Sequence, residues 1–301
     1  MPINQGYLKE DEMVEFLNGK TVSSLSDNLH QLLVRLFGVV DPNEKIKCEY
    51  CEQYTKPDFK VTYKGESRYV SMKSGDAETI HSEKVQTLIP FLRSIGVSKE
   101  TLKTLLLYQF GDGTTNGTGQ KRYNNHETYI WLKSRIQAAN AELNTDEMTE
   151  KIFERIVYQG VKDTVKPADC IYHGNYENGF LATKKQISLY IKDKDWSYLE
   201  NLHVGPLLMR PHARYAGVPI RNENNRIKMD FYWPKLKLDI IYISKKYYDY
   251  ESKRNYIIEE AKEEHRDTED DDCCIPFSEF EKKFKQPKKG LLSKLKDCIF
   301  G

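Results

Sequence analysis

The feature that most constrains the fold of this chain is an alternating pattern between residues 57 and 73. Its apolar members are Phe59, Val61, Val70 and Met72, with polar residues between them. Apolar residues at a spacing of two are typical of a strand that buries one face. We therefore predict an antiparallel hairpin with strands at residues 57–63 and 68–73. Its tight turn, residues 64–67, uses the positive φ that Gly65 adopts without strain.

The turn sets which residues of the hairpin face each other. With residues 64–67 in the turn, Asp58 lies opposite Lys73 and Lys60 lies opposite Ser71. Cross-strand partners share a face of the sheet, with Cβ atoms about 4.5–5.5 Å apart. We therefore expect a carboxylate and an ammonium group side by side on the polar face of an otherwise apolar hairpin.

Segments with a helical period flank the hairpin, and further short strands follow. Helices are predicted at residues 8–37 (interrupted near Gly19), 79–95, 98–107, 127–143, 146–158 and 183–191. Strands are predicted at residues 170–173, 204–210, 226–233 and 238–243. This order predicts an α/β fold: a central mixed β-sheet flanked by helices, with a helical insertion at about residues 98–165. We expect this domain to span residues 1–250 and a charged tail to span residues 251–301.

The charges of the chain nearly cancel, with 46 Lys and Arg against 45 Asp and Glu, but they are segregated. Residues 207–237 have seven basic and two acidic side chains, a local charge of +5, and residues 259–272 have a local charge of −7. This balance argues against a uniformly basic nucleic-acid-binding chain and leaves a local basic patch open. Six cysteines, no signal-peptide pattern and no apolar run of about 18 residues predict a cytoplasmic protein with no membrane partner.

The expected Asp58–Lys73 pair suits phosphodiester hydrolysis. A carboxylate is a ligand that Mg²⁺ prefers, and this ion usually retains several waters. A lysine beside the ion can orient one of those waters and stabilise charge on a phosphate. The pair alone also fits an ordinary exposed ion pair, which contributes little to stability.

Pro57-Asp58, then a hairpin, then Lys73 resembles the signature of the PD-(D/E)XK, or restriction-endonuclease-like, nuclease superfamily. The resemblance covers residues 49–83 and departs from the pattern at Ser71, where the family has its second acid. It implies a Mg²⁺ or Mn²⁺ cofactor, with Asp58, Lys73, Ser71 and a displaced acid in the catalytic site. Glu83, on the predicted following helix, is the candidate for that acid.

The same resemblance implies further metal ligands. The backbone carbonyl of Met72 is one, and an acid upstream of the hairpin is another. Glu49 and Glu52 are both placed for this role, and the pattern does not choose between them.

Two basic segments are candidates for contact with nucleic acid. One mixes basic and aromatic residues, which bind phosphates and stack on bases respectively; its arginines are Arg210, Arg214, Arg221 and Arg226. The other is the glycine-rich segment 111–119, followed by Lys121 and Arg122, which fits either a surface turn or a loop that approaches a phosphate. A lone Cys48-x-x-Cys51 has no second pair and does not predict structural zinc.

These observations favour a metal-dependent endonuclease that cuts double-stranded DNA, similar to type II restriction enzymes, and a homodimer would serve both strands. Two alternatives stay open. One is an RNA-directed nuclease, such as a toxin or antiviral effector. The other is a non-catalytic nucleic-acid-binding protein on the same scaffold, which the missing acid at Ser71 favours.

Overall fold

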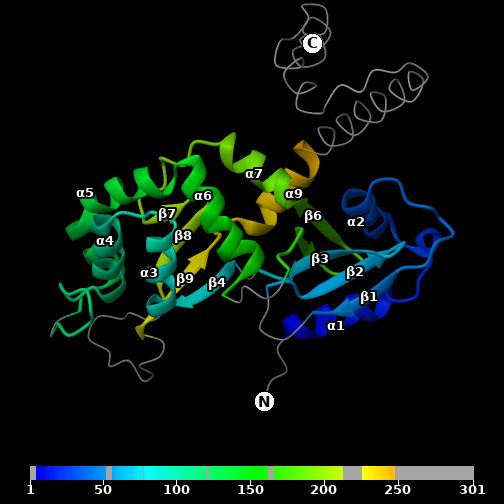
Figure 1. Cartoon of the computed structure of the whole chain (residues 1–301), viewed down its shortest axis with the longest axis horizontal. Helices are drawn as coiled ribbons and strands as arrows, with labels where there is room; N and C mark the ends of the chain where they lie inside the picture. Colours follow the sequence, from blue (N-terminus) through cyan, green and yellow to red (C-terminus); the bar gives the residue numbers. More distant parts are fainter. Residues whose placement is uncertain are drawn as a thin grey trace, which may run out of the picture. The chain divides into compact units, whose positions relative to one another are not determined.

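A computed structural model describes residues 5–51, 56–76, 78–119, 122–161, 166–212 and 226–247 of the chain (Figure 1). The chain divides into two units, residues 1–248 and 249–301, and all described residues belong to the first unit. The predicted tail, residues 251–301, therefore lies outside the described residues. None of the described helices is both long and apolar enough to cross a bilayer.

The order of elements is that of an α/β protein, as predicted. The helices are α1 (Gln5–Leu17), η1 (Val22–Ser24), α2 (Asp27–Phe37), α3 (Val85–Ser94), α4 (Lys99–Phe110), α5 (Asn125–Leu143), α6 (Asp146–Phe153), η2 (Glu154–Gln159), α7 (Lys184–Lys192) and α9 (Leu236–Lys246). The strands are β1 (Lys47–Tyr50), β2 (Phe59–Tyr63), β3 (Glu66–Lys73), β4 (Thr79–Lys84), β5 (Cys170–Gly174), β6 (Gly179–Thr183), β7 (His203–Val204), β8 (Leu207–Pro211) and β9 (Lys228–Tyr232).

The predicted mixed sheet has five strands in the order β1-β2-β3-β5-β6. Its neighbours are antiparallel except for β3 and β5, which are parallel. The predicted core face is confirmed, because Phe59, Val61, Val70 and Met72 are all buried against α1 and α2. The opposite side of β5 and β6 packs in a second core cluster that includes residues of α7 and α9.

The register predicted for the β2–β3 hairpin is wrong by two residues. Phe59 faces Val70 and Tyr63 faces Glu66, so only Lys64 and Gly65 form the turn. Both have positive φ, 47° for Lys64 and 80° for Gly65, which is the conformation of a type I′ turn and matches the twist of the strands. Because side chains alternate with a period of two, a shift of two leaves each of them on its predicted face.

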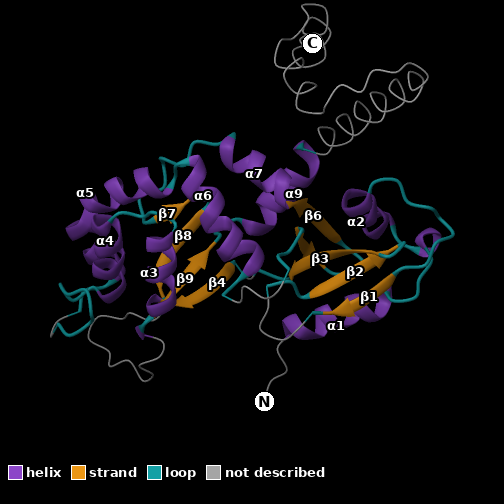
Figure 2. Ribbon diagram, viewed as in Figure 1, coloured by secondary structure: helices purple, strands orange, loops and turns teal. Residues whose placement is uncertain are grey.

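A second sheet, which the sequence analysis did not predict, has four antiparallel strands in the order β4-β9-β8-β7. Figure 2 shows α3, α4, α5 and α6 grouped around it. The predicted helix at residues 79–95 is wrong in its first turn and a half, because residues 79–84 form β4 and pair with β9. Pairing with a distant strand decides this segment, and the helix begins only at Val85.

Two further differences from the predicted elements concern residues 238–243 and strand β6. Residues 238–243 were predicted as a strand but lie within α9, whose buried Leu236, Ile240 and Ile243 are spaced by three and four. A short apolar run fits either a strand or a buried helix, so its period is a weak guide. Strand β6 was not predicted, although α7 after it begins as expected, with Thr183 in a capping box.

The predicted helical insertion is confirmed as α4, α5, α6 and the π-helical segment η2. Ser98 caps α4 by accepting a hydrogen bond from the Thr101 amide, as its position before the helix indicates. The buried faces of these helices pack in one core cluster with the second sheet. The insertion is therefore integrated with β4 and β7–β9 in one core.

Candidate functional site

The polar side chains predicted to meet at the hairpin do meet. The Nζ atom of Lys73 lies 3.7 Å from Oδ2 of Asp58, and both side chains are about four-fifths buried, with 20% and 18% exposed. The Met72 amide donates to Oδ2 of Asp58 over 2.5 Å, and the Met72 carbonyl accepts from Nζ of Lys73 over 2.8 Å. Ser71 Oγ lies 3.4 Å from the same Asp58 oxygen. These contacts fix a carboxylate, an ammonium and a carbonyl oxygen at one point of the sheet.

Local structure explains this convergence. Asp58 precedes β2, and its amide donates to the carbonyl of Val70, which continues the ladder by one residue. Lys73 is the last residue of β3 and is paired with the buried His173 of β5. The site therefore lies where the hairpin meets the parallel strand, and the hairpin's two-residue turn determines its register.

Glu10 of α1 interacts electrostatically with the same site, and no sequence pattern predicted this. Burial and the negative charge of Asp58 raise the pKa of Glu10 to about 7, while the ammonium of Lys73 acts in the opposite direction. The two carboxyl groups are thus close enough to repel each other. Glu10 stands in the run Glu10-Asp11-Glu12, in which no sequence signal distinguishes it from its neighbours.

Lys56 is the second missed residue. Its Nζ donates to the carbonyl of Ile80 in β4. The residue is partly exposed, yet burial of its ammonium and the charge of Lys73 lower the pKa of Lys56 to about 7, against the effect of Asp58. Its position two residues before Asp58 was the available sequence signal.

Glu83 is not where the sequence analysis expected it. It lies on strand β4 and its side chain is 1% exposed. Arg155 donates to both of its oxygens, over 2.7 and 3.3 Å, and His81 Nε2 lies 3.1 Å away. Burial raises the pKa of Glu83, but the hydrogen bonds from His81 and Arg155 outweigh it and lower the pKa to about 2. Among the described residues, no hydrogen bond or ion pair joins Glu83 to Asp58 or Lys73.

Of the two acids predicted as alternative metal ligands upstream of the hairpin, the structure describes only Glu49. Glu49 of β1 pairs with Lys47 at 2.9 Å and with Lys60 at 3.3 Å, and its side chain is 38% exposed. Glu52 lies outside the described residues. Glu49 is therefore neutralised at the surface, and Glu10 is the described acid that interacts with Asp58.

Three of the six residues predicted to contact nucleic acid, Arg122, Arg210 and Arg226, lie within the described residues. Arg214, Arg221 and Lys121 lie outside the described residues, and Arg122 is partly buried. Arg210 of β8 is exposed, with its guanidinium 4.1 Å from the Tyr232 ring centroid. Arg226 contacts Asp112 at 3.5 Å and donates to the Gly117 carbonyl.

The glycine-rich segment folds around an acid of its own. Asp112 accepts hydrogen bonds from the amides of Thr114 and Gly119, over 3.0 and 3.1 Å, and from Oγ1 of Thr114. These donors are satisfied within the loop, with Arg226 balancing the carboxylate. This arrangement favours the surface turn over a loop that approaches a phosphate.

The donor set at the hairpin suits a hard divalent cation. Asp58 and Glu10 supply carboxylates and Met72 a carbonyl, all oxygen ligands. Burial and the charge of Asp58 raise the pKa of Glu10, and a cation beside the two carboxyl groups would favour the ionised form of Glu10. Within the described ranges, no group of three or more His, Cys, Asp or Glu is placed to hold a metal. A set of two carboxylates and a carbonyl needs no such group, because Mg²⁺ keeps several waters.

Comparison of this chain with protein-family models, with curated proteins and with solved structures finds no match. The site is therefore interpreted from its own residues.

Proposed function

We propose that the protein is a metal-dependent endonuclease that hydrolyses phosphodiester bonds in DNA. The observation that supports this proposal is the convergence of Asp58, Lys73 and the Met72 carbonyl, with the carboxyl group of Glu10 near enough to repel Asp58. Asp58, Glu10 and the Met72 carbonyl would hold Mg²⁺ or Mn²⁺. When bound, the ion would supply Lewis acidity to the phosphate and lower the pKa of bound water.

The chain's own residues have separate parts in this chemistry. Lys73 is held by the Met72 carbonyl and by Asp58, so its ammonium is positioned to orient the attacking water and to stabilise negative charge on the phosphate. Ser71 stands where the nuclease superfamily that the hairpin resembles has an acid, and its hydroxyl faces Asp58. In this proposal Ser71 orients Asp58, and Glu10 takes the place of the missing acid in metal binding.

The resemblance of Pro57-Asp58 and Lys73 to restriction-type enzymes supports double-stranded DNA as the substrate. Cleavage of both strands requires two such sites, which a homodimer would supply. RNA is the alternative substrate, and the cleavage assay described next compares DNA with RNA.

The test measures cleavage of plasmid DNA and of a structured RNA with Mg²⁺ and with excess EDTA. Lys73→Met should lose nearly all cleavage, because it removes the ammonium and keeps the aliphatic stem. Lys60→Met is the matched control, since among the described residues the ammonium of Lys60 pairs with the partly exposed Glu49. Cleavage that persists in EDTA, or equal rates in the two variants, would contradict the proposal. Faster cleavage of RNA than of DNA would instead support the RNA-directed nuclease.

A further inference from the structure

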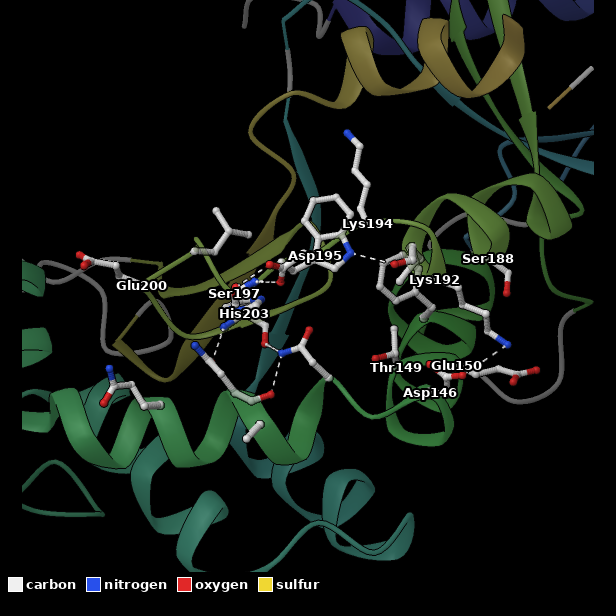
Figure 3. Close-up of a pocket in the computed structure, with 18 of the residues that line it drawn as sticks. Asp146, Thr149, Glu150, Ser188, Lys192, Lys194, Asp195, Ser197, Glu200 and His203 are labelled. Carbon is white, nitrogen blue, oxygen red and sulfur yellow. Dashed lines mark hydrogen bonds and ion pairs between the residues drawn. The ribbon is translucent and has the colours of Figure 1, made fainter. Parts of the chain in front are cut away.

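A second concave site lies in the helical part of the molecule. A cavity of about 740 Å³ is bordered by α5, α6, α7, the segment of residues 193–200 and His203 (Figure 3). This volume falls within the range of about 300–1,000 Å³ that small-molecule sites occupy. Its walls include none of Glu10, Asp58 or Lys73, so this site is separate from the hairpin site.

Aromatic side chains provide much of the wall. Tyr129, Phe153, Tyr158 and Trp196 all border the cavity and are at least nine-tenths buried. The indole of Trp196 is fixed, because its Nε1 donates to the Ile191 carbonyl over 3.0 Å. The ammonium of Lys194 lies 5.6 Å from its ring centroid. Rigid aromatic walls favour a flat, aromatic ligand.

The ionic side chains around the cavity balance each other. Four lysines and four acidic residues border it, and one pair, Lys192 and Asp146, is 4.0 Å apart. A site for a polyphosphate or another polyanion would have an excess of basic groups. The balance therefore favours a ligand without net charge.

His203 supplies a specific polar contact. It is 3% exposed, and its Nδ1 lies 3.1 Å from the carbonyl of Gly205. A carbonyl only accepts, so Nδ1 bears the proton and Nε2 has the free lone pair. Burial lowers the pKa of His203, which keeps the ring neutral. His203 borders the cavity, and among the described residues no hydrogen bond to its Nε2 is found, so this acceptor nitrogen is open to a ligand's donor.

Backbone contacts hold this histidine in place. Its amide donates to Oδ1 of Asn140 over 3.1 Å, and its carbonyl accepts from Nδ2 of Asn144 over 3.0 Å. Both asparagines belong to α5 or its end and border the cavity themselves. The acceptor is therefore fixed relative to the aromatic wall.

We propose that this cavity binds a neutral, planar nitrogen heterocycle of nucleoside size, whose N–H group donates to Nε2 of His203 while its ring packs against the aromatic wall. The four common ribonucleosides have this chemistry: an uncharged flat base, N–H donors and a polar sugar. Purines and pyrimidines differ in donor placement, so the same titrations define which base fits.

The test is calorimetric titration of the full-length protein with adenosine, guanosine, cytidine and uridine, and with ATP as the charged comparator. At least one nucleoside should bind with a Kd below about 1 mM, and ATP should bind no more tightly than adenosine. If no nucleoside binds, or if ATP binds about tenfold more tightly than adenosine, the proposal is wrong.

Two variants locate the binding. Ala141→Trp places a large side chain in the cavity from an exposed position of α5, and should weaken binding at least about tenfold. Ala138→Trp is the matched control, because Ala138 is exposed on the same helix and does not border the cavity. His203→Phe removes the acceptor and should also weaken binding, provided that its melting temperature matches the wild type. Equal weakening by both tryptophans, or no effect of Ala141→Trp, would overturn the assignment.

Discussion

Asp58, directly before β2, and Glu83, within β4, are both largely buried acids, yet their surroundings differ. Glu83 is fully neutralised by Arg155 and His81, and these hydrogen bonds lower its pKa to about 2. Asp58 shares one lysine with a second acid, Glu10, whose pKa rises to about 7 through burial and the charge of Asp58. Glu83 is therefore paired within the fold, whereas the carboxyl groups of Asp58 and Glu10 repel each other.

This difference indicates which acid has a structural role and which a functional one. A buried carboxylate with a two-pronged arginine partner holds two elements together, here β4 and η2. A carboxyl group whose pKa is raised by burial and by a neighbouring carboxylate, as that of Glu10 is, costs stability when it ionises, and such groups cluster at functional sites. Under the proposed function, Asp58 and Glu10 bind the metal, and Glu83 holds β4 and η2 together.

The largest effect is expected from Asp58→Asn. The amide keeps an oxygen to accept from the Met72 amide, so the fold should persist, but the ligand charge is lost. Loss of about 4 kcal/mol of charge stabilisation corresponds to a rate about a thousandfold lower. Single-turnover cleavage with saturating Mg²⁺ measures it, with Glu49→Gln as the control. Equal rates in these two variants would end the functional assignment of Asp58.

Glu83→Gln should reduce stability and leave catalysis in the folded protein unchanged. A pKa lowered from 4.5 to about 2 corresponds to about 3 kcal/mol. Because the folded-state pKa is depressed, this contribution is complete above about pH 4.5 and is lost as the pH falls through about 2. Urea unfolding of both proteins at pH 7 and at pH 3 should show the difference shrinking. A stable Glu83→Gln protein that fails to cleave would return Glu83 to the active site.

Glu10→Gln should weaken Mg²⁺ binding by about tenfold, about 1.4 kcal/mol, because it removes one of two ligand charges. Without the metal its stability at pH 8 should equal or exceed that of the wild type, since an ionised Glu10 is repelled by Asp58. Calorimetric titration with Mg²⁺ checks the first expectation and thermal unfolding the second. Glu12→Gln, exposed on the same helix, is the control. An unchanged affinity for Mg²⁺ in Glu10→Gln would show that Glu10 of α1 is not a metal ligand.

The smallest effects concern the turn that sets the register of the site. Lys64→Asn should stabilise the protein by up to about 1 kcal/mol, because asparagine tolerates the φ of 47° better than lysine. The exposed Lys64–Asp41 contact at 3.9 Å that it removes contributes little. Gly65→Ala should destabilise by about 1 kcal/mol, given a φ of 80°. Chemical denaturation measures both, and changes of the same sign would contradict the type I′ turn.

Local pattern was sufficient for one part of the fold and of the site. The alternation at Phe59, Val61, Val70 and Met72 predicted the buried face of the hairpin, and the period of two kept Asp58 and Lys73 together despite the register error. The α/β class followed from the order of helical and strand segments, and the helical insertion followed from the helical periods of residues 98–165.

The other features depend on pairing over long sequence separations, which local pattern does not encode. Residues 79–84 become a strand only because β9 lies beside them, and this moved Glu83 from a helix to a buried ion pair. Glu10 is about fifty residues from Asp58 in the sequence, and only the packing of α1 brings their charges together. The cavity is likewise assembled from separate parts of the chain: α5, α6, α7, the segment of residues 193–200 and His203.

The most direct test is the position of Mn²⁺ in an anomalous difference map from crystals of the wild-type protein soaked in this ion. We predict a peak within coordination distance of the carboxylates of Asp58 and Glu10 and of the Met72 carbonyl. A peak bound to Glu83, or a well-ordered map with no peak at Asp58, would contradict it.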